Sequence, residues 1–363
     1  MQDKIKVFIK KIIEDYFLSI QQYHRIVADK PSEVHLSVTE NCCLQCKMCD
    51  IWKIKEKQDP LNYRTGKKII CKLREWLGPF NLTFAGGEPF LNKDILKIIK
   101  YANDKNIKTS TNSNGFVIDK NLAKKICESG LSTIFFSIDG LEKEHDYIRG
   151  RKDTFKKVLN AILFIKNSDT NNKPKIYINT VISNNNILLI GKMIELAKKL
   201  GVEGINFQTI MPNFASTYKN DWWKYNPLWP KSKKIIKNSI NELIENKKKL
   251  GNYILNSQRN IQNFEKYLLD PNTYQKEEKC FVGLNNLMVD TSGNVRLCYE
   301  MDKIGNILED DPNLIWKGPK AKIIRKQIEQ CKKPCKLLPC NITNYSNILK
   351  RKIESFNKFF ENK

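Results

Sequence analysis

The sequence predicts an α/β protein, built as a partial (β/α)6 TIM-like barrel with a small C-terminal domain. Between residues 32 and 211, six short apolar segments alternate with segments in which apolar residues recur every three or four positions. This alternation is typical of a parallel sheet covered by helices. Polar or glycine-rich residues follow several apolar segments, which is where a barrel carries its chemistry. A doubly wound open sheet is the alternative, but no GxGxxG motif opens the first unit.

The six expected strands are short and rich in β-branched and aromatic residues. They lie at residues 34–39, 82–85, 107–112, 133–138, 175–182 and 202–208. The connecting helices are expected at residues 66–77, 92–104, 119–129, 153–167 and 187–200. Residues 1–31 share the helical spacing and are interpreted as an N-terminal helical extension, so that the barrel occupies residues 32–211.

The composition changes after residue 211, where we expect the barrel to end. Residues 212–279 are interpreted as a connector that begins with tryptophans and prolines and continues as a helical stretch rich in Lys and Asn. Its tryptophans either pack against the barrel or stack on a substrate. Residues 280–345 contain five cysteines, and a Thr291-Ser292-Gly293 turn predicts a hairpin there. Residues 346–363 are expected to form a C-terminal helix or tail.

The overall composition limits the class of protein. The chain has 63 Lys and Arg residues against 39 Asp and Glu residues, a net charge of +24, and 41% of its residues are hydrophobic. General disorder is excluded, and no apolar run is long enough to span a membrane. Glu14 and Asp15 interrupt any signal-peptide core, so we expect a cytoplasmic protein. The basic residues are scattered, which favours a solvated basic surface with no dedicated nucleic-acid site.

Eleven cysteines in a reducing compartment indicate metal or cluster ligation rather than disulfides. Cys42, Cys46 and Cys49 form a CxxxCxxC motif directly after the first expected strand. Three thiolates leave one iron of a four-iron cluster open to another ligand, whereas a closed zinc site takes four ligands. Zinc completed by His35 or Cys43, or unligated buried thiols, are the alternatives. In the cluster interpretation Cys43 is a bystander.

An ordered set of strand-end signals follows the cysteine motif. Gly86-Gly87-Glu88-Pro89 ends the second expected strand, Asn114-Gly115 follows the third, and Ser137-Ile138-Asp139-Gly140 ends the fourth. Together with CxxxCxxC, this order resembles the radical S-adenosylmethionine (radical SAM) superfamily over residues 32–210. The position before the third cysteine is often aromatic in that superfamily. Here it is Met48, which is apolar and soft enough to pack against adenine.

The resemblance implies a cofactor and a reaction. Cys42, Cys46 and Cys49 would hold a [4Fe–4S] cluster whose open iron binds the methionyl amine and carboxylate of SAM. An electron from this cluster would split SAM into methionine and a 5′-deoxyadenosyl radical, which abstracts a hydrogen from the substrate. A small electron-transfer protein such as flavodoxin or ferredoxin would supply the electron.

Six residues at the strand ends are candidates for binding SAM. They are Gly86, Gly87, Glu88, Asn112, Ser137 and Asp139. The glycines let the backbone approach the cofactor closely, and the glutamate accepts a hydrogen bond from the methionyl ammonium. The other three are candidates for ribose and carboxylate contacts, with ordinary turn residues as the alternative.

The second group of cysteines is Cys280, Cys298, Cys331, Cys335 and Cys340. Its first half, C-x12-G-x4-C, resembles the SPASM and twitch extensions of radical SAM enzymes, which hold auxiliary iron–sulfur clusters. Five thiolates are enough for one fully ligated four-iron cluster but not for two. We expect one auxiliary [4Fe–4S] cluster bound by Cys280, Cys298 and Cys331, with Cys335 or Cys340 as the fourth ligand. A cluster with an open iron for substrate, and a zinc ribbon-like site, are the alternatives.

The resemblance implies an enzyme that performs oxidation or bond formation, either on a peptide, as in the maturation of ribosomally made peptides, or on a small metabolite. The 41 residues before Cys42 are too few for a leader-binding winged-helix domain, which weakens the peptide hypothesis. A radical SAM enzyme acting on tRNA is the alternative that the net charge suggests. A zinc-binding, nucleic-acid-associated protein is the third hypothesis.

Overall fold

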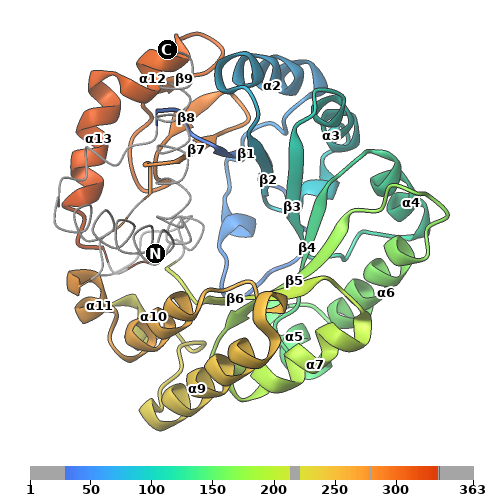
Figure 1. Cartoon of the computed structure of the whole chain (residues 1–363), viewed down its shortest axis with the longest axis vertical. Coiled ribbons are helices and arrows are strands. Elements are labelled where there is room, and N and C mark those ends of the chain that lie inside the picture. The colour runs from blue at the N-terminus through green and yellow to red at the C-terminus, as the bar shows by residue number, and fades with distance from the viewer. Residues whose placement is uncertain (1–28, 213–220, 278–279, 281, 334, 336–363) are drawn as a thin grey trace, which may run out of the picture.

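The computed structural model describes residues 29–212, 221–277, 280, 282–333 and 335. Within them, one nine-stranded sheet has the order β6-β5-β4-β3-β2-β1-β7-β8-β9. Every neighbouring pair from β6 to β7 is parallel, whereas β8 pairs antiparallel with both β7 and β9. Figure 1 shows the strands as an arc with helices on its outer side. The expected partial barrel is confirmed.

The elements follow one another as the periodicity predicts. The strands are β1 (Glu33–Thr39), β2 (Asn81–Gly86), β3 (Lys108–Ser113), β4 (Thr133–Ser137), β5 (Lys175–Ile182), β6 (Gly204–Thr209), β7 (Asn286–Val289), β8 (Asn294–Arg296) and β9 (Gly305–Asn306). The barrel helices are α2 (Tyr63–Leu77), α3 (Ile95–Asp104), α4 (Lys120–Glu128), α5 (Glu142–Arg149), α6 (Thr154–Lys166) and α7 (Ile190–Leu200). The later helices are α8 (Trp222–Tyr225), α9 (Lys233–Leu250), α10 (Gln258–Leu269), α11 (Pro271–Glu277), α12 (Pro312–Lys317) and α13 (Pro319–Glu329).

The barrel strands alternate between two kinds of side chain. In β1, Val34, Leu36 and Val38 are fully buried, while His35 and Ser37 between them are half-buried. The buried face packs against the helices, and the other face lines the interior of the barrel. Because only one face of the sheet packs against helices, the strands carry polar residues at every second position instead of continuous apolar runs.

The hairpin expected in the C-terminal region is confirmed, and its first strand extends the barrel sheet. β7 lies parallel to β1, with Glu33 opposite Asn286 and Leu36 opposite Val289. The turn between β7 and β8 needs Gly293, whose φ is +85°. Cys280 and Cys298 therefore lie before and after a hairpin whose first strand is hydrogen-bonded directly to the first barrel strand.

The tryptophans of the connector pack among themselves. Trp222, Trp223 and Trp229 are 6–9% exposed, and the ring centroids of Trp222 and Trp229 lie 5.4 Å apart. Trp229 also contacts Tyr267 of α10, at 5.5 Å between centroids. Of the two interpretations of these residues, the structure supports packing.

The short helix α5 was not expected, because its eight residues (EKEHDYIR) are too polar to show an apolar stripe. Residues 1–28 of the expected N-terminal extension and the tail 346–363 lie outside the described residues. Among the helices that the structure describes, none combines the length and the apolar character that a membrane span requires.

Candidate functional site

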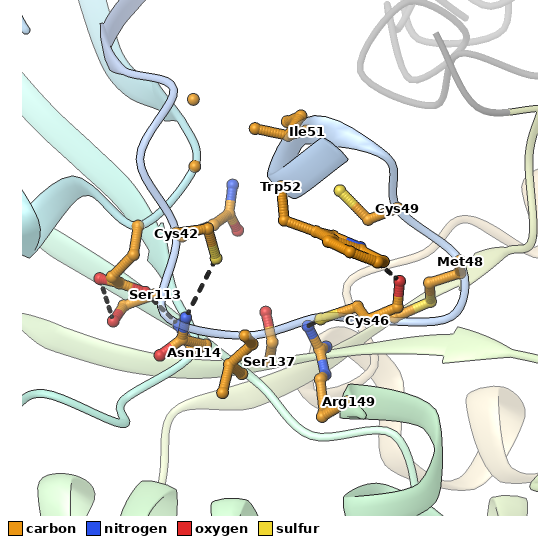
Figure 2. A pocket seen from close by; sticks show the side chains of 15 residues that line it. Cys42, Cys46, Met48, Cys49, Ile51, Trp52, Ser113, Asn114, Ser137 and Arg149 are labelled. Carbon is orange, nitrogen blue, oxygen red and sulfur yellow. Dashed lines mark hydrogen bonds between the residues drawn. The ribbon is translucent and has the colours of Figure 1, made fainter. Parts of the chain in front are cut away.

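A cavity of about 120 Å³ lies at the carboxyl ends of β1 to β4. Figure 2 shows how the loop after β1, the strand ends and the last residue of α5 surround it. Its lining residues are Cys42, Leu44, Cys46, Met48, Cys49, Ile51, Trp52, Gly86, Gly87, Glu88, Asn112, Ser113, Asn114, Ser137 and Arg149. The structure therefore brings together the three motif cysteines and five of the six predicted SAM-site residues; Asp139 is the exception.

The cysteine loop runs between β1 and the 3-10 turn η2 (Ile51–Lys53). Cys46 is buried, and Cys42 and Cys49 are half-buried. Burial raises the pKa of Cys49 to about 11 and raises that of Cys46 as well, whereas a hydrogen bond with Cys43 lowers the pKa of Cys42 to about 6. The three thiols thus lie in a partly buried site, and a thiol can bind a metal only after it is deprotonated.

The donor set fits a cluster better than a single ion. In the part of the chain that the structure describes, no three His, Cys, Asp or Glu side chains are grouped so that they could hold one metal ion. A four-iron cluster sets a different requirement, because each thiolate ligand binds a separate iron. Cys42, Cys46 and Cys49, distributed around one cavity, fit that requirement.

The Gly86-Gly87 end of β2 lies directly against the start of the cysteine loop. A Cβ at Gly86, where φ is +126°, would lie 2.1 Å from the carbonyl oxygen of Thr39, and one at Gly87 would lie 2.2 Å from that of Asn41. The backbone N–H of Gly87 donates to Thr39 (2.7 Å), and that of Glu88 donates to Asn41 (2.8 Å). The close approach that these glycines permit is therefore between β2 and the cysteine loop.

Glu88 is held in place by three hydrogen bonds. Its side chain is buried, and Oε1 accepts from the Ser113 hydroxyl (2.9 Å) and the backbone N–H of Phe90 (3.3 Å). Oε2 accepts from the backbone N–H of Asn114 (2.8 Å). Burial raises the pKa of Glu88 to about 7, although the hydrogen bonds oppose that rise. A carboxylate offers about four acceptor positions, so one remains for a ligand in the cavity.

Asn112 and Ser137 reach the cavity from β3 and β4. The carbonyl oxygen of the Asn112 side chain accepts from Nδ2 of Asn179 in β5 (2.5 Å). The side-chain oxygen of Asn179 in turn accepts from Nδ2 of Asn206 in β6 (2.8 Å). This chain of amides crosses the barrel interior and fixes the orientation of Asn112, so that its NH₂ group is left to donate.

Asp139 does not line the cavity but lies behind its wall. Its carboxylate is fully buried, and Oδ1 accepts from the backbone N–H of Val181 (2.8 Å). Oδ2 lies 2.5 Å from Nη2 of Arg149. A buried carboxylate needs such a partner because an unpaired charge is costly in the protein interior. Arg149, not Asp139, therefore faces the cavity, and its Nη1 lies 3.8 Å from Sγ of Cys46.

Sequence reasoning missed six residues of the cavity wall, namely Leu44, Ile51, Trp52, Ser113, Asn114 and Arg149, of which three are polar groups next to the cysteine loop. Arg149 ends the unexpected helix α5, and the only local signal was Gly150, a typical residue just after a helix end. Asn114 was noted as a turn residue, but its Nδ2 lies 3.8 Å from Sγ of Cys42. Trp52 comes three residues after the last motif cysteine and donates from Nε1 to the carbonyl oxygen of Cys46 (3.3 Å).

Four of the five C-terminal cysteines are among the described residues; Cys340 is not. Burial raises the pKa of Cys280 to about 12, and the charges of Cys298 and Cys331 add to that rise. Burial raises the pKa of Cys298 to about 11, again with a contribution from Cys331. These three thiols therefore lie within electrostatic range of one another, at the start of the hairpin, after β8 and after α13. Cys335 follows Cys331 by four residues.

Comparison with models of known protein families gives further evidence about this chain. The model of the radical SAM superfamily matches residues 36–197, and the SPASM model, an iron–sulfur cluster-binding domain, matches residues 280–341. The two matches together cover more than half of the chain. The second match includes all five C-terminal cysteines.

Three relatives illustrate the range of similar proteins. Fe-coproporphyrin III synthase of Methanosarcina barkeri is 35% identical over 135 residues, which are 37% of this chain and only 34% of that protein. An uncharacterized protein of Methanocaldococcus jannaschii is 27% identical over 305 residues, covering 82% of this chain and 94% of the relative. A probable GTP 3′,8-cyclase of Saccharolobus solfataricus is 24% identical over 307 residues, covering 82% and 90%.

Solved structures share the fold. SuiB of Streptococcus suis, bound to the precursor peptide SuiA, has a TM-score of 0.61 at 14% identity and covers 87% of this chain and 71% of its own. The protein anSMEcpe, with bound AdoMet and a peptide, has a TM-score of 0.60 at 18% identity and covers 91% and 98%. Family models, fold and the three-cysteine cavity agree, and we conclude that this chain belongs to the radical SAM superfamily, binds SAM beside a [4Fe–4S] cluster and carries a SPASM-type iron–sulfur domain.

Proposed function

We propose that this protein cleaves SAM reductively and directs the resulting 5′-deoxyadenosyl radical to a hydrogen atom of a peptide or a small metabolite. The observation that carries this proposal is the cavity at which Cys42, Cys46 and Cys49 meet the Gly86–Glu88 strand end and Arg149. When bound to these cysteines, a [4Fe–4S] cluster supplies the electron that breaks a carbon–sulfur bond of SAM. The protein's own part is to bind, orient and shield the cofactor.

The cavity wall offers a partner for each polar end of the methionyl group. Nε of Arg149 is buried and has no hydrogen-bond partner among the described residues, so it can donate to the SAM carboxylate. Glu88 keeps one acceptor position for the ammonium group. Asn112 and Ser137 provide an amide and a hydroxyl for the ribose. For Asp139 we propose an indirect part, in which its carboxylate holds Arg149 in position.

The apolar part of the wall suits the adenine ring and the exclusion of water. Met48, Ile51 and Trp52 line the same cavity as the motif cysteines. The Trp52 ring is anchored by its hydrogen bond to Cys46, so it is held beside the cluster loop. A closed apolar wall protects a reactive intermediate from solvent.

We propose one auxiliary [4Fe–4S] cluster in the SPASM-type domain. Cys280, Cys298 and Cys331 are its ligands, with Cys335 or Cys340 as the fourth. The mutual electrostatic influence of the first three thiols supports this grouping. The auxiliary cluster assists the oxidation or bond formation that follows hydrogen abstraction.

Both substrate classes have support. Two similar structures contain bound peptides, whereas two relatives are named for a coproporphyrin and for GTP. The amide side chains of Asn112, Asn179 and Asn206 give the barrel interior a polar lining that matches either a peptide backbone or a polar metabolite.

The proposed reaction is tested by anaerobic reconstitution. The protein should take up about eight irons and eight sulfides per chain, and dithionite should then release 5′-deoxyadenosine from SAM. Cys46→Ala should abolish the release, whereas Cys127→Ala, a fully buried cysteine outside the cavity wall, should retain it. A wild-type protein loaded with both clusters that does not cleave SAM would contradict the proposal.

The substrate class is tested by product formation. Peptides encoded near the gene, a tetrapyrrole, a nucleotide and a tRNA, each deuterated, are incubated separately with SAM and reductant. Deuterium in the released 5′-deoxyadenosine identifies the compound that loses a hydrogen. Transfer from a peptide or small metabolite supports the proposal, and transfer only from a tRNA would contradict it.

A further inference from the structure

The outer surface of the cysteine loop carries basic side chains stacked on aromatic rings. Nζ of Lys47 lies 4.7 Å from the ring centroid of Tyr147. The guanidinium carbon of Arg151 lies 4.0 Å from the ring centroid of Phe116, and Nζ of Lys157 lies 5.9 Å from the same centroid. We call these five residues the cluster-loop patch. Cation–π contacts hold its charges in defined positions at the surface.

The patch is attached to the loop that holds the cluster ligands. Lys47 directly follows Cys46 in the chain, and its backbone N–H donates to the carbonyl oxygen of Ile148 in α5 (2.9 Å). Nη1 of Arg151 donates to the backbone carbonyl of Cys43 (3.0 Å). Electron transfer weakens steeply with distance, so a carrier bound at this patch would reach the cluster by a short route.

The positive charges of the patch are not neutralised by their surroundings. Lys47, Arg151 and Lys157 are exposed, and within the ranges described by the structure none of them forms an ion pair. The nearby carboxylate of Asp146 accepts from the Thr154 hydroxyl (2.6 Å) and from backbone N–H groups. Two further acids, Asp153 and Glu142 of α5, lie within ion-pair distance of a different lysine, Lys156. Asp146 keeps its negative charge in its hydrogen bonds, but the three basic residues of the patch outweigh it, so the patch presents a net positive field beside the cluster loop.

We propose that the cluster-loop patch is the docking surface for an acidic electron-transfer protein of the flavodoxin or ferredoxin type. This inference rests on the proposed function, which requires one electron from outside the protein for each SAM that is cleaved. In each productive encounter the reduced carrier loses one electron and the [4Fe–4S] cluster gains it, and no bond forms or breaks. Charge complementarity of this kind accelerates the encounter more than it strengthens the complex.

The test compares two double charge reversals. Lys47→Glu/Lys157→Glu reverses two charges of the patch without touching the Arg151 bond to the loop. Lys322→Glu/Lys326→Glu makes the same change in net charge on α13, which Figure 1 places on the opposite side of the molecule from α5 and α6. Iron content and the visible spectrum establish that all three proteins carry the same clusters.

Two measurements are made at about 20 mM and about 300 mM salt. Reduced flavodoxin should reduce the patch variant about 10-fold more slowly than wild type at low salt, and the difference should shrink at high salt. The α13 variant should stay close to wild type. Oxidised flavodoxin should bind the patch variant more weakly as well, which is a readout that needs no turnover. With dithionite in place of flavodoxin, all three proteins should cleave SAM at the same rate.

Equal rates and equal flavodoxin binding for the two double variants would overturn the docking proposal. A rate difference that does not depend on salt would also overturn it, because electrostatic steering is screened by ions. Failure of dithionite to drive SAM cleavage in the wild-type protein would count against the proposed function instead. In that case the binding of oxidised flavodoxin still decides whether the patch is a docking surface.

Discussion

Arg149 and Asp139 form an ion pair in which both partners are almost completely buried. Removing one partner of such a pair leaves the other as an unpaired charge in the protein interior. We expect Arg149→Met to lower the free energy of unfolding by about 3–5 kcal/mol, measured by urea unfolding of the cluster-free protein.

The matched control is the double variant Asp139→Asn/Arg149→Met, in which no unpaired charge remains. It should be more stable than Arg149→Met alone, because the charge that causes the loss has been removed. If the free energy of unfolding of Arg149→Met lay within about 1 kcal/mol of the wild-type value, the ion pair would be solvated, contrary to its position in the structure.

His145 is a buried histidine that the fold keeps neutral. Its Nδ1 accepts from the backbone N–H of Asp139 (3.1 Å), and burial lowers its pKa to about 3. Between that value and the ordinary 6.5, the unfolded chain binds a proton that the folded chain does not. Stability should therefore fall as the pH decreases from 6.5, with His145 alone contributing about 3 kcal/mol by pH 4.

The comparison variant His145→Asn keeps an acceptor for the Asp139 N–H but has no group that titrates in this range. Urea unfolding of both proteins from pH 4 to pH 8 checks the expectation. Because His35 is also buried and has its pKa lowered to about 4, the difference between the two curves is the informative quantity. If the free energies of unfolding of the two proteins changed with pH in parallel, His145 would not be a source of the pH dependence.

At the scale of elements, helix α5 positions the cluster loop through its last turn. Gly150 follows the helix with φ of +71°, and a Cβ there would lie 2.2 Å from the carbonyl oxygen of Gln45. Gly150→Ala should therefore both strain the helix end and push the cysteine loop outward. We expect a loss of more than about 2 kcal/mol and a lower iron content after reconstitution.

Gly201 supplies the matched control because it ends α7 in the same left-handed conformation, with φ of +58°. A Cβ at Gly201 would meet only the flexible end of Lys166. Gly201→Ala should cost about 1–2 kcal/mol through backbone strain and leave the iron content unchanged. Equal iron content in both variants would show that α5 does not support the loop.

At the scale of the whole molecule, one sheet joins the SAM site to the auxiliary cysteines through the β1–β7 pair. Although the two cofactor sites share one sheet, each should lose its iron without affecting the iron content of the other. The double variant Cys280→Ala/Cys298→Ala should lower the iron content from about eight to about four per chain. SAM cleavage by dithionite should persist, while formation of the final product should fail.

The complementary triple variant Cys42→Ala/Cys46→Ala/Cys49→Ala should also retain about four irons, but it should not cleave SAM. Iron analysis and 5′-deoxyadenosine release measure both effects. Retention of all the iron by the Cys280/Cys298 variant would show that the C-terminal thiols bind no cluster.

The alternation of strands and helices, the three-cysteine loop and the glycine-rich end of β2 could all be predicted from the amino-acid sequence. These features are local: periodicity reports which face of an element is buried, and three ligands within eight residues must share a loop. The same reasoning put Asn112 and Ser137 at one edge of the sheet, since parallel strands end there, and both line the cavity; their part in binding SAM stays a prediction.

Features that depend on residues far apart in the chain could not be predicted in this way. That Asp139 turns away from the cavity and Arg149 takes its place follows from the energy of burying a charge, which depends on packing and not on spacing. The Asn112–Asn179–Asn206 chain and the pairing of β7 with β1 likewise join segments separated by tens to hundreds of residues. Such contacts leave no local periodicity, so only the folded chain reveals them.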